Sequence, residues 1–132
     1  MPHSILFCDD EPHILRAAEF KFLKAGYEVR TAGDGEEGWE LIRRQVPDML
    51  ITDCQMPRLD GPGLIARLRA HEETRELPVV MLTAKGFELS HRELAERWNV
   101  LAILPKPFSP RGLLECVEQV LATGRYDRPL PV

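Results

Sequence analysis

The sequence has few cysteines, and their arrangement excludes the usual roles of cysteine in small domains. Only three occur in 132 residues, at Cys8, Cys54 and Cys116. An odd number at wide spacing, without a CxxC pair, is not the framework of a disulfide-rich secreted domain. The four histidines also lack the ligand spacing of a zinc site. We therefore expect a reduced, cytoplasmic setting.

The sequence also lacks a long apolar stretch and a basic stripe. No apolar run approaches the roughly 20 residues that span a bilayer, and Met1–Ser4 does not resemble a signal peptide. Lysines and arginines number 17 against 21 aspartates and glutamates, which gives a formal net charge of −4. This balance argues against binding to a nucleic-acid phosphate backbone. We expect no direct contact with membranes or nucleic acid.

Hydrophobic patterning predicts five strands that alternate with five helices. Short apolar or alternating runs predict strands over residues 5–8, 27–31, 49–53, 79–82 and 100–104. Helical spacing predicts helices over residues 12–25, 34–46, 62–70, 87–98 and 110–121. In the second of these helices, Trp39, Ile42 and Val46 are expected to face the core. We expect one domain over residues 1–122, followed by a tail or the start of a linker over 123–132.

Strands that alternate with helices predict parallel βαβ units and an α/β fold. Four of the five predicted strands end in reactive polar side chains, whereas the second ends in Thr31-Ala32-Gly33. The polar residues are Asp9 and Asp10 after the first strand, Asp53 after the third, Thr83 after the fourth and Lys106 after the fifth. If they share one pocket, the second strand must lie outside the first. This predicts a doubly wound, flavodoxin-like parallel sheet in the order 2-1-3-4-5, with the pocket at its switch point.

The residues at these strand ends indicate phosphoryl chemistry. Carboxylates in one cleft repel each other unless a cation is present, and oxygen ligands without a Cys/His cluster favour Mg²⁺. Lys106 adds a positive charge and Thr83 adds a hydroxyl, so phosphoryl oxygens could bind beside them. The Asp53 carboxylate would then act as nucleophile in an in-line transfer. Each residue taken singly has a structural alternative, such as acids that stabilise a helix N-terminus.

The pattern of these motifs resembles a response-regulator receiver domain over residues 4 to about 122. The motifs are Cys8-Asp9-Asp10-Glu11-Pro12, Asp53 with Met56-Pro57 and Asp60-Gly61, Thr83-Ala84, and Lys106-Pro107-Phe108. The resemblance implies that Asp53 accepts phosphate from a histidine kinase or a histidine phosphotransfer protein. It also implies that Asp10 and the Gln55 carbonyl bind Mg²⁺ directly, that Asp9 binds it through water, and that the Lys106-Pro107 bond is cis.

The resemblance further implies that Thr83 and Lys106 contact the phosphoryl group. Such a module catalyses only its own phosphorylation and dephosphorylation, so we do not expect an enzyme in the ordinary sense. The downstream effector cannot be identified from the sequence.

The chain departs from the family where a signal would leave the pocket. Ile103 stands three residues before Lys106, where most receivers carry Tyr or Phe, and Asn99-Val100 replaces Gly-Ala. Thr83 and Ile103 are the candidate switch residues, but an aliphatic Ile103 cannot copy the swing of an aromatic ring. We therefore expect the change to concentrate in residues 84–88 and in the predicted helix behind them. The alternative function is a binding scaffold with the same fold that works without phosphorylation. A phosphatase with an aspartate nucleophile would need a second acid two residues after Asp53, where this chain has Gln55.

Overall fold

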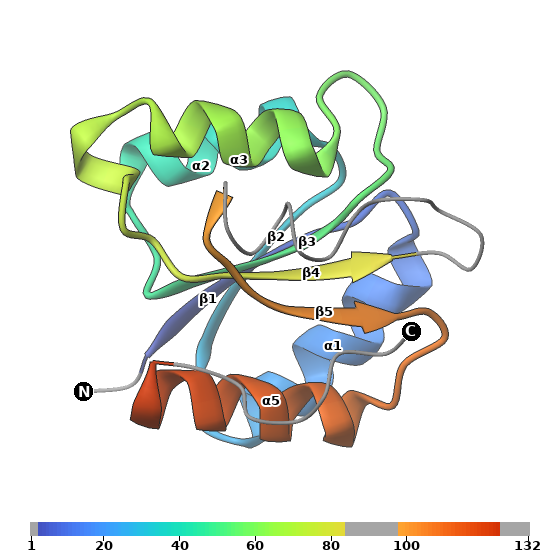
Figure 1. The fold of residues 1–132 in the computed structure, drawn as a ribbon. Coiled ribbons are helices and arrows are strands. Elements are labelled where there is room, and N and C mark those ends of the chain that lie inside the picture. Colours follow the sequence, from blue (N-terminus) through green and yellow to red (C-terminus); the bar gives the residue numbers. More distant parts are fainter. Residues whose placement is uncertain (1–2, 84–97, 125–132) are drawn as a thin grey trace.

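The computed structural model describes residues 3–83 and 98–124, in which a five-stranded sheet lies between two layers of helices (Figure 1). The strands are β1 (Ser4–Cys8), β2 (Glu28–Ala32), β3 (Met49–Asp53), β4 (Val79–Thr83) and β5 (Val100–Pro105). Their order is β2-β1-β3-β4-β5, and all neighbouring strands are parallel. The predicted α/β architecture and strand order are confirmed, with β2 at one edge.

The described helices cover both faces of the sheet. They are α1 (Pro12–Lys24), α2 (Gly35–Arg44), α3 (Gly61–Arg69), the short 3-10 helix η1 (Glu72–Thr74) and α5 (Pro110–Thr123). In Figure 1, α2 and α3 lie on one face, and α1 and α5 lie on the other. No helix among the described residues is both long enough and apolar enough to cross a membrane.

Local capping explains where three of these helices begin. Asp34, Asp60 and Ser109 each accept a hydrogen bond from a backbone N–H group in the first turn of α2, α3 and α5. Proline stands at the start of α1, α3 and α5, where its missing N–H group costs nothing. The predicted helix over 87–98 falls almost wholly outside the described residues.

One prediction for the second helix is wrong. Helix α2 ends at Arg44, and Val46 lies beyond it with 41 % of its surface exposed. Ile42 is buried as predicted, and Trp39 is half-buried against the core. Val46 comes after Gln45, whose backbone is already extended, so it no longer continues the helical face.

The core consists of two apolar layers, one on each face of the sheet. Leu6 and Leu50 belong to the layer beneath α2 and α3, whereas Ile5 and Ile51 belong to the layer beneath α1 and α5. Successive strand residues point to opposite faces, so the central strands are apolar on both sides. All five residues of β3 are buried, and this strand ends at Asp53. A carboxylate therefore lies at the carboxyl edge of the most buried strand.

Candidate functional site

The strand register brings the predicted polar residues to one edge of the sheet. Cys8 in β1 pairs with Thr52 in β3, so the residues that follow them, Asp9 and Asp53, lie side by side. This edge between β1 and β3 is the switch point of the sheet, where open α/β folds bind ligands. At the same edge, Lys106 directly follows β5, and its N–H group donates a hydrogen bond of 2.7 Å to the carbonyl oxygen of Thr83 at the end of β4.

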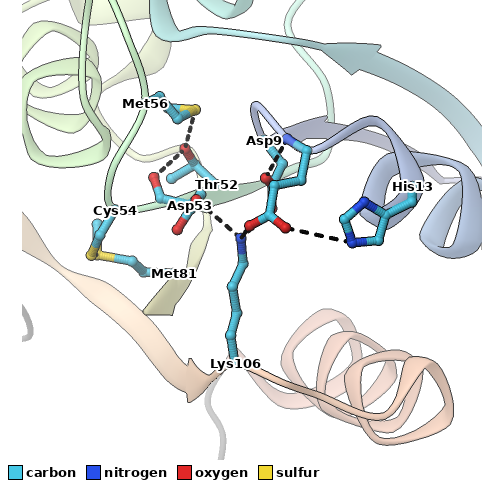
Figure 2. Close-up of polar contacts among 9 residues, drawn as sticks. Asp9, His13, Thr52, Asp53, Cys54, Met56, Met81 and Lys106 are labelled. Carbon is cyan, nitrogen blue, oxygen red and sulfur yellow. Dashed lines mark hydrogen bonds and ion pairs between the residues drawn. The ribbon is translucent and has the colours of Figure 1, made fainter. Parts of the chain in front are cut away.

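Apart from His13, whose Nε2 lies 3.5 Å from Glu11 Oε2, the only basic residue in the described part of the chain that contacts Asp9, Glu11 or Asp53 is Lys106. Its Nζ lies 2.8 Å from Asp9 Oδ2, 3.0 Å from Asp53 Oδ2 and 3.2 Å from Glu11 Oε1. Figure 2 shows its side chain extending from the end of β5 toward Asp9 and Asp53. The side chains of Lys106, Asp9 and Asp53 are 10 %, 2 % and 6 % exposed. A single ammonium thus links two buried carboxylates.

The acids suit a hard divalent cation. Asp9, Asp10, Glu11 and Asp53 each offer a carboxylate oxygen, and these oxygens all lie within 4.8 Å of one another. Asp53 Oδ1 is buried and has no hydrogen-bond partner in the part of the chain that the structure describes. Three of these carboxylates contact one ammonium, and an oxygen-only donor set of this kind matches Mg²⁺. The residues present therefore fit the predicted metal.

The environment shifts the pKa of both central groups. Burial raises the pKa of the Asp53 carboxyl above its ordinary value, although the hydrogen bond and charge of Lys106 oppose this effect. Burial by itself lowers the pKa of Lys106, but the carboxylates of Asp9 and Asp53 outweigh it, and the net shift is upward. The raised pKa keeps Lys106 an ammonium at neutral pH, while the raised pKa of Asp53 means that burial disfavours its charged form.

The remaining predicted site residues lie near the same edge. Asp10 is exposed beside the buried Asp9, and Thr83 is half-buried at the end of β4. The side chain of Gln55 is exposed on the loop after β3, so only its backbone carbonyl is suited to the site. The Lys106-Pro107 bond is cis, as the resemblance implied.

Ile103, by contrast, lies in the core. It is 1 % exposed and belongs to the apolar layer beneath α2 and α3. Its place in β5 is opposite Met81 in β4. The structure does not test its predicted part in switching, and residues 84–88 lie outside the described part of the chain.

Two features of the site went beyond the sequence prediction. Glu11 contacts Lys106, although the sequence suggested only an acid near a helix start. Gly61 holds the loop after Asp53 against its strand, because its N–H group donates to the Cys54 carbonyl at 2.9 Å. A Cβ atom at Gly61 would lie 2.4 Å from the Asp53 carbonyl oxygen, so only glycine fits there. The Asp60-Gly61 pair was a visible signal for this second feature.

Comparison with known proteins points to one family. The family model for the response regulator receiver domain matches residues 5–118. The chain is 38 % identical over 122 residues to a probable transcriptional regulator ycf27 of Porphyra purpurea, covering 89 % of this chain and 46 % of that protein. It thus spans about half the length of the curated relatives of this kind.

Solved structures show the same likeness. A putative response regulator from Chloroflexus aurantiacus matches with a TM-score of 0.83 and 38 % identity, covering 92 % of this chain and 99 % of that one. The receiver domain of a sensor histidine kinase from Pseudomonas aeruginosa, described with a magnesium ion in its active-site cleft, matches with a TM-score of 0.81 and 28 % identity. That match covers 93 % of this chain and all of the other.

Proposed function

The chain belongs to the family of response regulator receiver domains of two-component systems, and from this premise we propose that Asp53 receives a phosphoryl group in a Mg²⁺-dependent reaction. The donor would be a histidine kinase or a histidine phosphotransfer protein. The observation that carries this proposal is the contact of Lys106 Nζ with Asp53 Oδ2, beside an Asp53 Oδ1 atom that has no partner among the described residues.

The two oxygens of Asp53 have different environments, which suits a nucleophile. Lys106 holds Oδ2 at 3.0 Å and so fixes the carboxylate, whereas Oδ1 is buried and has no hydrogen-bond partner among the described residues, which leaves its lone pairs for phosphorus. A bond forms between this oxygen and phosphorus while the bond from phosphorus to the leaving group breaks. The Lys106 ammonium, held protonated by its acid partners, can then donate to a phosphoryl oxygen. The Thr83 hydroxyl is a second, neutral donor in this proposal.

Asp9, Asp10, Asp53 and the Gln55 carbonyl would hold the Mg²⁺ ion, in keeping with the cluster of acidic oxygens. When bound, the ion would neutralise charge on the carboxylates and the phosphoryl oxygens. A related receiver domain is described with magnesium in its active-site cleft, which supports this assignment. We place the module in the cytoplasm, where its three buried cysteines would remain free thiols.

Intact-mass measurement after incubation with Mg²⁺ and phosphoramidate tests the proposal. The wild-type chain should gain one phosphoryl group, and Asp53→Asn should gain none. Asp48→Asn is a matched control, because it makes the same change just before the opposite end of β3. Wild-type protein that is folded yet never phosphorylated would support the alternative, a binding scaffold that works without phosphorylation.

A further inference from the structure

Lys106 has three acidic partners, and they differ sharply in exposure. Asp9 and Asp53 are buried, with side chains 2 % and 6 % exposed, whereas the Glu11 side chain is 45 % exposed. The contact with Glu11 is also the longest of the three, at 3.2 Å. The ammonium donates hydrogen bonds to Glu11 Oε1 and Asp53 Oδ2, and Asp9 Oδ2 lies beside it as an ion pair.

Glu11 stands where a capping residue is expected, yet its side chain does not cap. It is the N-cap residue of α1, with an extended backbone at φ −100° and ψ 105°, and makes no side-chain hydrogen bond to the helix. The other described α-helices all have a side-chain cap, from Asp34, Asp60 or Ser109. Glu11 instead directs Oε1 to Lys106, while its Oε2 lies 3.5 Å from His13 Nε2 in α1. Helix capping does not explain the contact with Lys106.

A phosphoryl oxygen that approaches Lys106 must compete with these three carboxylates for the ammonium. Releasing Asp9 or Asp53 would leave a buried charge without its partner, which is costly. Releasing Glu11 costs less, because water can solvate its half-exposed carboxylate. Of the three partners, Glu11 is therefore the one that an incoming phosphoryl group displaces.

We propose that Glu11 is a positioning residue that occupies one donor of Lys106 until a phosphoryl group displaces it. The Glu11 carboxylate draws the ammonium toward the rim of the pocket. This slows formation of the contact between Lys106 and the phosphoryl group. The effect on transfer rests on the proposed function of Asp53. The sharing of the ammonium does not, and can be measured without any phosphodonor.

Two variants of Glu11 separate positioning from charge. Glu11→Gln removes the charge, whereas Glu11→Asp keeps it but shortens the side chain by one methylene. Aspartate is a favoured N-cap residue, so the shorter carboxylate of Glu11→Asp should accept a hydrogen bond from a backbone N–H group in the first turn of α1 and release Lys106. Glu28→Gln is the control for net charge, because Glu28 is exposed at the start of β2, away from the carboxyl edge.

The first measurement is the rate of phosphorylation by phosphoramidate at saturating Mg²⁺. An exposed ion pair is worth up to about 1 kcal/mol, so both Glu11 variants should react about two- to fivefold faster than the wild type. Glu28→Gln should match the wild type. Unchanged or slower rates in both Glu11 variants would overturn the proposal, and so would a faster rate in Glu11→Gln alone, because charge and not position would then explain it.

The second measurement is the ¹⁵N signal of the Lys106 ammonium without metal or phosphodonor. It should shift in both Glu11 variants and stay in place in Glu28→Gln. An unmoved signal in Glu11→Asp and Glu11→Gln would refute the shared contact. If the wild type were never phosphorylated, the proposed function would fail, and this signal would still decide whether Glu11 positions Lys106.

Discussion

Lys106 Nζ lies 3.0 Å from Asp53 Oδ2, although β5 and β3 are separated in the sheet by β4. The lysine side chain crosses the carboxyl end of β4 to reach the aspartate. Its own backbone N–H group is bonded to Thr83 at the end of β4, which sets the starting point of that reach. The central contact of the site thus depends on the register of three strands, and three predictions concern the groups around it.

Lys106→Met should destabilise the protein at pH 7. It leaves Asp9 and Asp53 as buried carboxylates without their cation, and losing one partner of a buried ion pair typically costs about 3–5 kcal/mol. Urea unfolding would measure the loss, and added Mg²⁺ should recover part of it. Lys24→Met is the control on an exposed helix end. Equal stability of Lys106→Met and the wild type would contradict this account of the pocket.

Ionisation of Asp53 should lower the free energy of unfolding as the pH rises. Its folded pKa is raised, chiefly by burial, above the unfolded value of about 3.9, so the fold favours the protonated form. Its favourable contribution is therefore lost between about pH 3.9 and the folded pKa. Asparagine does not ionise, so Asp53→Asn does not lose this contribution. Its free energy of unfolding, relative to that of the wild type, should therefore be higher at pH 7 than at pH 3. Unfolding at both pH values, with Glu28→Gln at an exposed carboxylate as control, tests this; a constant difference between Asp53→Asn and the wild type would refute it.

Asp10→Asn should weaken Mg²⁺ binding more than Asp9→Asn, as expected if Asp10 is the direct ligand and Asp9 binds through water. The structure adds a second distinction between them. Asp9 is buried, contacts Lys106 and accepts the Glu11 N–H group, whereas Asp10 is exposed. Without metal, Asp10→Asn should thus leave stability nearly unchanged and Asp9→Asn should not. Isothermal titration and urea unfolding would decide, and equal Mg²⁺ affinity in both variants would contradict the assignment.

Asn99 provides a prediction away from the pocket. Its backbone has φ 54°, a left-handed conformation just before β5 that asparagine and glycine tolerate well. Asn99→Gly and Asn99→Ala both remove the side chain and differ only by a Cβ atom. Asn99→Ala should be less stable than Asn99→Gly by about 1 kcal/mol, which is the reverse of the order of these two residues in a helix. Thermal unfolding of the pair measures the difference, and a more stable alanine variant would be inconsistent with this backbone.

The sequence by itself determined the strand order and the chemistry at the carboxyl edge. Each strand is a short apolar run that can be recognised from its own residues, and parallel strands place their carboxyl ends on one side. Polar residues follow every strand but the second, and this put Asp53 and Lys106 in one pocket. The family resemblance added the cis bond before Pro107, which the structure contains.

Only the tertiary structure decided how the acids share one ammonium. Glu11 and Lys106 are 95 residues apart in the chain, so no local pattern can show that Glu11 turns to Lys106 instead of capping α1. The exposure of Val46 likewise depends on where α2 ends and not on the apolar spacing that predicted its burial. Local periodicity determines which residues form an element. Contacts between distant elements determine which side chain finally holds which partner, because several partners compete for the same group.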